Sequence, residues 1–178
     1  GDNVVFGLYN AVRRQGRAIL LGAVGSGAAL WDVSLRRGLR PVEGFFYPGT
    51  RSVGIRCEIP ALGGSAFVHI DPDGRVWEHL DGLVRQAVPG QNESTFMHLD
   101  PGIVVGMNAR GDQAFEHDFA LEMQPQRIQK LIPLDNGGVL IHTVGLDDAN
   151  LNVVRRWSAQ GIESWVYGVG GSVTHNSI

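Results

Sequence analysis

The chain has 178 residues, of which 43% are hydrophobic and 19% charged, values typical of a globular chain long enough to bury a core. Fifteen basic and 18 acidic residues give a formal net charge of −3, so we expect neither nucleic acid nor a membrane surface as a partner. The single cysteine, Cys57, excludes an intrachain disulfide and a multi-cysteine metal site.

The chain shows no targeting or membrane-spanning segment. No apolar run reaches the roughly 18 residues that a membrane-spanning helix needs. The first residues lack the order of a basic region followed by an apolar one that marks a signal peptide. We therefore expect a cytoplasmic protein. Because the chain begins at Gly1 without a methionine, we interpret it as a processed piece or a segment of a longer protein.

Three segments, residues 3–16, 27–38 and 147–161, have a common pattern. Each has apolar residues three or four positions apart, a pair of arginines near its end and a closing glycine. Arginines suit the negative end of a helix dipole, and glycine suits the left-handed residue that ends a helix. The pattern therefore predicts three helices. A short strand-like run follows each glycine, at residues 17–24, 39–47 and 162–167.

The middle of the chain is less regular. Residues 76–88 carry apolar side chains on one helical stripe and predict a fourth helix, and residues 71–74 predict a turn before it. The remaining buried strands are expected at residues 66–70, 103–107 and 138–144. Alternating helices and strands favour one α/β domain over residues 1–178, Rossmann-like in its first half, with a mixed or parallel sheet and flanking helices.

An all-β, propeller-like repeat is the alternative fold. Four glycines lie between short apolar runs, 36, 37 and 50 residues apart, and three of them precede an aromatic residue. These glycines are Gly38, Gly74, Gly111 and Gly161. Such spacings suit propeller blades. The blades do not account for the doubled arginines and the helix caps, so we favour the α/β fold.

A glycine-rich turn is the most informative motif. An apolar strand at residues 18–21 leads into a glycine cluster, which opens the helix expected next. Glycines let backbone N–H groups approach a phosphate, which then lies at the positive end of the helix. The predicted ligand-binding residues are Gly22, Gly25, Ser26 and Gly27. A tight connection without a ligand is the alternative, because a glycine cluster alone is a weak motif.

A family resemblance is carried by the run Gly22-Ala23-Val24-Gly25-Ser26-Gly27, followed by Arg37-Gly38, Val42-Glu43-Gly44-Phe45 and Ile59-Pro60-Ala61-Leu62-Gly63-Gly64. This part of the chain resembles the Rossmann-like, nucleotide-sugar-binding N-terminal domain of bacterial sugar acetyltransferases, over residues 17–64 only. The resemblance implies a nucleotide or nucleotide-activated sugar as ligand, with group transfer as the reaction. Phe46 and Tyr47 stand where the family has an acidic residue, and this difference argues against NAD. Residues 65–178 lack the family's hexapeptide repeat, so its catalytic histidine has no counterpart here.

A second glycine loop follows the last expected strand. Gly170 and Gly171 are predicted to bind the same ligand, because loops at the carboxyl ends of parallel strands face one crevice. His175, a few residues further on, is the candidate catalytic base. A C-terminal tail without a catalytic role is the alternative.

The remaining histidine, cysteine and tryptophan side chains are expected to have structural roles and not catalytic ones. Histidines beside carboxylates, such as His79 and His117, lack the spacing of a helical zinc site, so we expect polar surface positions beside aromatics and no metal. Cys57 lies in an alternating apolar run and is expected to be a buried thiol. Three tryptophans are expected in the core: Trp31, Trp157 and Trp165.

Two functions of different classes remain open. The first is binding of a nucleotide or nucleotide-sugar through the glycine-rich turn, with group transfer on that ligand. The second is a non-catalytic structural or interaction module of a larger assembly. With either function, the chain could form a homo-oligomer. The sequence leaves open whether the chain is an enzyme and which cofactor it would use.

Overall fold

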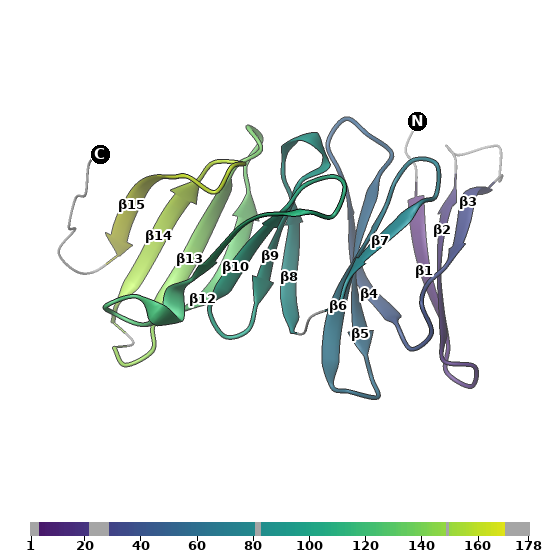
Figure 1. Ribbon diagram of the computed structural model, residues 1–178, viewed down its shortest axis with the longest axis horizontal. Coiled ribbons are helices and arrows are strands. Elements are labelled where there is room, and N and C mark those ends of the chain that lie inside the picture. The colour runs from purple at the N-terminus through teal and green to yellow at the C-terminus, as the bar shows by residue number, and fades with distance from the viewer. Residues whose placement is uncertain (1–3, 22–28, 81–82, 149, 170–178) are drawn as a thin grey trace. The chain divides into compact units, whose positions relative to one another are not determined.

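A computed structural model describes residues 4–21, 29–80, 83–148 and 150–169 (Figure 1). Within these ranges the chain forms fifteen strands and two short 3₁₀ helices, and no α-helix. The protein is therefore all-β, and the α/β, Rossmann-like prediction is wrong. No helix in the described ranges is long and apolar enough to cross a membrane. The chain divides into two compact units, residues 1–83 and 84–178. The expectation of a single domain stays a prediction.

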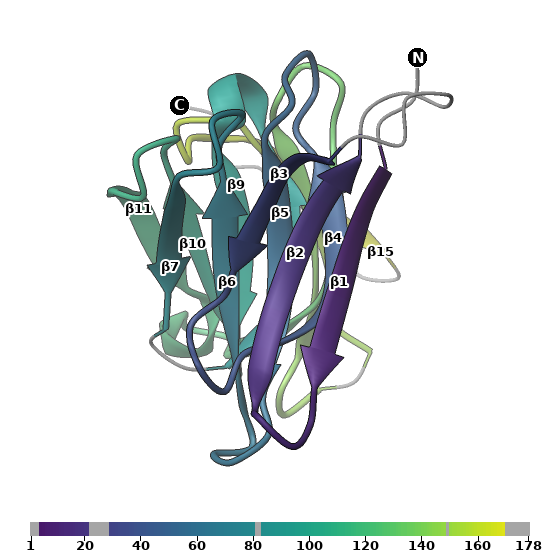
Figure 2. The ribbon, with the colours of Figure 1, turned by 90° about the vertical axis from the view of Figure 1, so that its right-hand side faces the viewer.

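The first unit contains two antiparallel sheets (Figure 2). The three-stranded sheet has the order β1 (Val4–Asn10), β2 (Gln15–Leu21), β3 (Ala29–Ser34). The four-stranded sheet has the order β4 (Arg40–Phe46), β5 (Val53–Ile59), β6 (Gly64–Ile70), β7 (Val76–His79). Strands β1 and β2 lie against β4. The core between the two sheets includes Leu20, Trp31, Ile55, Cys57 and Val68.

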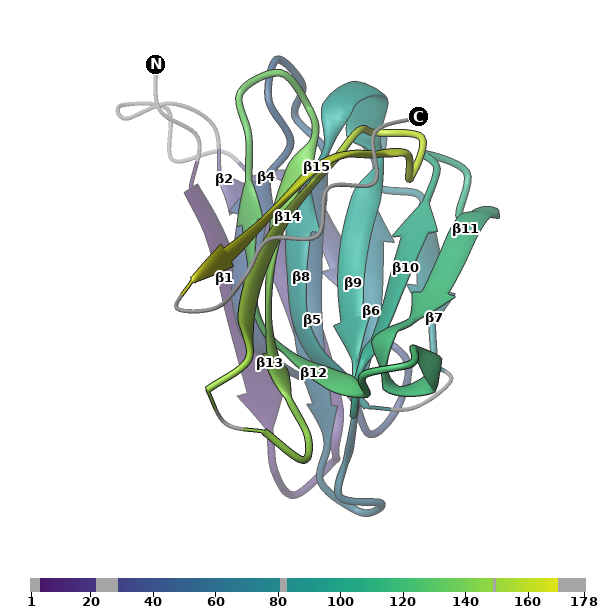
Figure 3. The ribbon, with the colours of Figure 1, turned by 90° about the vertical axis from the view of Figure 1, so that its left-hand side faces the viewer.

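The second unit contains two four-stranded antiparallel sheets (Figure 3). One consists of β8 (Val84–Pro89), β9 (Thr95–Leu99), β10 (Ile103–Met107) and β11 (Gln113–Asp118). The other consists of β12 (Gln126–Pro133), β13 (Val139–Gly145), β14 (Asn152–Trp157) and β15 (Glu163–Val169). The 3₁₀ helices are η1 (Gln91–Glu93) and η2 (Phe119–Leu121). Strand β12 lies against β8 and β9, over a core that includes Phe96, Phe119, Ile141 and Trp157.

All four predicted helices are replaced by strands and turns. Residues 4–16 form β1, a turn and the start of β2, and residues 29–34 form β3. Residues 76–88 contain β7 and part of β8, and residues 147–161 contain β14. A closing glycine does not distinguish the two structures, because a left-handed residue ends a helix and also closes a hairpin. Gly38 and Gly161 do have positive φ angles, of 94° and 76°, but in turns between strands.

The all-β alternative fits the structure. Each four-stranded sheet is an up-and-down meander in chain order, the topology of a propeller blade. The first strands of the four sheets begin 36, 44 and 42 residues apart along the chain, close to the roughly 40–45 residues of a propeller repeat. Within each unit, the first strand of one sheet lies against the first strand of the next.

The same turn joins the last two strands of all three four-stranded sheets. Gly74, Gly111 and Gly161 have φ angles of 82°, 85° and 76° in these turns. Each turn opens with a side-chain oxygen that accepts two backbone N–H groups, at distances between 2.8 and 3.3 Å. The accepting residues are Asp71, Asn108 and Ser158. This repeated chemistry explains three of the four glycines in the predicted propeller spacing. Gly38 differs, because it lies between β3 and β4.

Candidate functional site

The residues predicted to bind a nucleotide, which are Gly22, Gly25, Ser26, Gly27, Gly170 and Gly171, lie outside the described residues, as does the candidate base His175. The strands around them nevertheless exclude the predicted strand-to-helix turn. The strands before and after the first glycine cluster, β2 and β3, pair antiparallel, so no helix follows this cluster. The named strands all pair antiparallel, so the predicted crevice at the ends of parallel strands has no basis. Nucleotide binding itself stays a prediction.

The last sheet, β12–β15, has one buried face and one exposed face. Leu131, Ile141 and Trp157 alternate with outward-facing residues on three of these strands, are at most 5% exposed and belong to the core of the second unit. The intervening side chains project from the opposite surface, because successive residues of a strand point to opposite sides. None of the intervening residues whose side chains the structure describes is buried. The sheet therefore has a complete surface that no described part of its unit covers.

The exposed face is defined by the strand register. Its side chains form three rows across the sheet: Ile132, Leu140, Arg156 and Trp165; Lys130, His142, Val154 and Tyr167; Arg127, Val144 and Asn152. Trp165 is 42% exposed and Tyr167 58%. The exposed face of an antiparallel sheet is usually polar, whereas this one has six apolar or aromatic positions out of eleven. An apolar patch edged by polar residues is typical of an interaction site.

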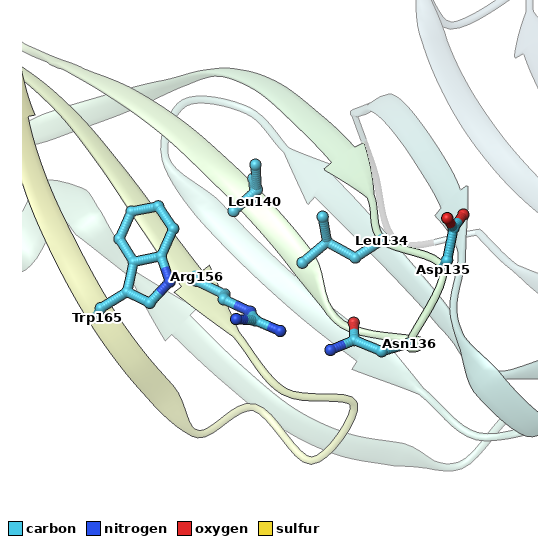
Figure 4. A pocket seen from close by; sticks show the side chains of 6 residues that line it. All are labelled: Leu134, Asp135, Asn136, Leu140, Arg156 and Trp165. Atoms are coloured by element: carbon cyan, nitrogen blue, oxygen red, sulfur yellow. The ribbon is translucent and has the colours of Figure 1, made fainter.

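A shallow hollow of about 420 Å³ lies at one end of this face (Figure 4). Leu134, Asp135 and Asn136 line it from the turn between β12 and β13. Leu140, Arg156 and Trp165 line it from three neighbouring strands. In Figure 4 the Arg156 side chain runs from beside Trp165 toward Asn136. The hollow therefore combines an indole ring, two leucines, a guanidinium group, a carboxylate and a side-chain amide.

Arg155 and Arg156 illustrate the two faces. Arg155 points to the buried side, where its Nη2 lies 2.9 Å from Glu122 and its Nη1 3.0 Å from Glu163. Its guanidinium also lies 5.1 Å from the centre of the Phe119 ring. Arg156 makes no ion pair and no side-chain hydrogen bond within the described part of the chain. Its positive charge is therefore available to a partner.

A polar network surrounds Arg155 and connects the two sheets of the second unit. His117 Nε2 lies 2.9 Å from Glu122 Oε1, and the His117 ring contacts the Phe119 and Trp157 rings edge-on. The Trp157 indole N–H donates to Glu163 Oε2 at 3.3 Å. These contacts hold η2 and β11 against β14 and β15, which indicates a structural role. Among the described residues, no group of three or more histidine, cysteine or carboxylate side chains could hold a metal ion.

Two buried titratable side chains, Cys57 and His98, are too enclosed to act on a substrate. Burial raises the pKa of the Cys57 thiol to about 12, with the nearby Glu78 carboxylate contributing. The thiol is fully buried, as the sequence predicts, and at neutral pH it is protonated and a poor nucleophile. Burial lowers the pKa of His98, which is only 7% exposed. Neither residue has the exposure that a substrate would require.

Sequence reasoning missed the exposed face. It placed Trp165 in the core with Trp31 and Trp157, which are 8% and 5% exposed. That prediction is confirmed for the other two and wrong for Trp165. The sequence does contain a signal for this face. Trp165 and Tyr167 lie two residues apart on a predicted strand, and such residues point to the same side of a sheet. Which side is exposed depends on the pairing with β14, which the sequence does not reveal.

Comparisons with known proteins identify a fold but no family. No family model and no curated protein matches the chain. Among solved structures, a eukaryotic initiation factor matches over 94% of this chain and 43% of its own, with 11% identity and a TM-score of 0.59. A protein from Lactobacillus plantarum matches over 91% of this chain and 56% of its own, with 11% identity and a TM-score of 0.48. A luciferin-regenerating enzyme matches over 95% of this chain and 64% of its own, with 11% identity and a TM-score of 0.46. The chain thus spans about half the length of these structures.

The match to the initiation factor shows the fold alone, which is all-β and propeller-like. It corrects the resemblance to the nucleotide-sugar-binding domain of sugar acetyltransferases. That resemblance depends on a strand, a helix and a second parallel strand, whereas residues 29–34 form β3, antiparallel to β2. The motifs that carried it, Val42-Glu43-Gly44-Phe45 and Pro60-Ala61-Leu62-Gly63-Gly64, lie in β4 and around the β5–β6 turn.

Proposed function

We propose that the chain is a non-catalytic interaction module that binds a protein partner through the exposed face of β12–β15. The observation that carries this proposal is the combination of Trp165, Tyr167 and Arg156 on one uncovered sheet surface. Tryptophan, tyrosine and arginine are the residues most enriched at the energetic centres of protein interfaces. They bury a large area and also offer polar groups for orientation.

The rest of the described structure supports binding rather than catalysis. The hollow beside Trp165 is lined by three apolar residues and by Asp135, Asn136 and Arg156, and it contains no nucleophile next to a general base. Cys57 is buried and protonated. A cytoplasmic location, which suits a free thiol, is part of the proposal.

The proposal is tested by finding a partner and measuring its dependence on Trp165. The immobilised chain captures proteins from a lysate of its source cells, and each captured protein is purified and its Kd measured by calorimetry. We expect a partner whose Kd rises about tenfold or more with Trp165→Ala. Leu121→Ala is the matched control, because Leu121 is 83% exposed in the same unit but lies outside the face.

Two results would contradict the proposal. One is that every purified partner binds Trp165→Ala as tightly as the unsubstituted chain. The other is that no partner is found, while a thermal-shift screen with UDP-sugars, NAD, coenzyme A and S-adenosylmethionine shows stabilisation at millimolar concentrations. The second result would favour the nucleotide function predicted for residues 22–27 instead.

A further inference from the structure

The exposed face carries a local excess of positive charge. Three of its eleven residues are cations, Arg127, Lys130 and Arg156, and none makes an ion pair within the described ranges. No carboxylate occupies any of the eleven positions, and Asp135 is the one acidic residue among those that line the hollow. The unit as a whole, residues 84–178, is acidic, with six basic and ten acidic residues. Half of its cations therefore gather on one sheet surface.

The arrangement around Arg156 suits a carboxylate. Its planar guanidinium can donate two parallel hydrogen bonds to one carboxylate group, which a lysine cannot do. The Trp165 ring and Leu140 line the same hollow, and an apolar surrounding that excludes water strengthens such a charge pair. Lys130 and Arg127 lie in the next two rows, so a segment that crosses the sheet would meet further cations.

The positions between the cations are aliphatic except for His142, which pairs with Lys130. Leu140 lies between Arg156 and β12, Val154 pairs with His142, Val144 pairs with Arg127, and all three are half-buried. An apolar side chain of a partner would bury area on them, whereas a phosphate backbone would gain nothing there. A polyphosphate strand would also approach a unit whose net charge is negative, which weakens its attraction. The observations therefore favour a protein segment over a nucleic acid.

On this basis, and resting on the proposed function, we infer that the partner presents an acidic protein segment. Its carboxylates pair with Arg156, Lys130 and Arg127, and its apolar or aromatic residues cover the valines, Leu140 and Trp165. Such a face selects against basic partners, because two unpaired cations would be brought together at the interface.

The inference is tested with peptides by fluorescence anisotropy. The probes are a labelled twelve-residue peptide of three Glu-Leu-Asp-Phe repeats, the matched amide peptide of Gln-Leu-Asn-Phe repeats, and a twelve-nucleotide oligouridylate. We expect the acidic peptide to bind at least fivefold more tightly than the amide peptide, and less tightly as salt rises. Arg156→Gln should weaken its binding at least fivefold, and Arg156→Lys should restore only part of it. Arg110→Gln, in the turn between β10 and β11, is the charge-matched control and should change nothing.

Three results would overturn the inference. Equal binding of the two peptides, or no saturation at millimolar peptide, would remove the acidic requirement while leaving the proposed function to its own test with the captured partner. Tighter binding of the oligouridylate, lost in Arg156→Gln, would assign the face to single-stranded nucleic acid. A dimer in sedimentation that Trp165→Glu converts to a monomer would assign it to a second copy of this chain.

Discussion

At the residue scale, alternation along a strand decides the role of each side chain. Arg155 and Arg156 are neighbours in sequence, and as a pair they predict the end of a helix. In β14 they point to opposite faces, so Arg155 is held between Glu122 and Glu163 while Arg156 is left without a partner. The same rule separates Trp157, which is 5% exposed, from Trp165, which is 42% exposed on the neighbouring strand.

His98 provides a prediction about pH. Its ring is buried in β9, Nε2 has no hydrogen-bond partner among the described residues, and burial lowers its pKa from 6.5. The unfolded chain therefore binds a proton at a higher pH than the folded chain does, so acid favours unfolding. We expect the free energy of unfolding, measured in urea, to fall as the pH is lowered from 7.5 to below 6.5. The loss should continue until the pH passes the lowered pKa.

The matched variant is His98→Gln, which removes the titrating group but keeps a polar side chain. Its stability should depend less steeply on pH than that of the unsubstituted chain, because the histidine that binds a proton on unfolding is absent. The carboxylates that titrate in acid are the same in both proteins, so they contribute equally. Identical pH dependences for the two proteins would show that His98 is not the buried neutral group described here.

At the element scale, the repeated turn is the part of the fold that the sequence reveals best. Residues 71–74 were predicted as a turn, and the spacing of Gly74, Gly111 and Gly161 suggested blades. Strands such as Ile103–Met107 were also predicted correctly. The helices were wrong because apolar residues three or four apart occur both on one helix face and on either side of a short turn. Only the pairing of strands distant in sequence separates these cases.

Gly161 tests whether this turn is held in place by an aromatic side chain. It has a φ of +76°, and a Cβ there would lie 2.4 Å from the Phe115 ring. Gly49 has nearly the same φ, +75°, with no atom within 4 Å of the Cβ position. Gly49→Ala should cost about 1 kcal/mol, because it only forces a left-handed backbone on alanine. Gly161→Ala should cost about 3 kcal/mol in urea unfolding, because it also displaces the ring. Equal costs would contradict the contact with Phe115.

At the scale of the whole molecule, the net charge of the sequence does not predict where charged side chains gather. A net charge of −3 says nothing about where the charges lie, and the second unit is acidic overall yet gathers three unpaired cations on one sheet. The candidate face consists of residues from four strands, between Arg127 and Tyr167, so it exists only once β12–β15 are paired. Local motifs such as the glycine cluster can be recognised in the sequence alone, whereas this face can be recognised only when the strand pairing is known.

The central proposal is that a partner binds to the exposed face of β12–β15. Fluorine NMR of the chain carrying 5-fluorotryptophan tests this claim directly, because the chain has four tryptophans in different environments. Trp31 and Trp157 are buried and serve as internal references, and single substitutions assign the signals. On adding the purified partner, we predict that the Trp165 signal moves while the signals of Trp31 and Trp157 stay in place. A partner that binds without moving the Trp165 signal would contradict the account.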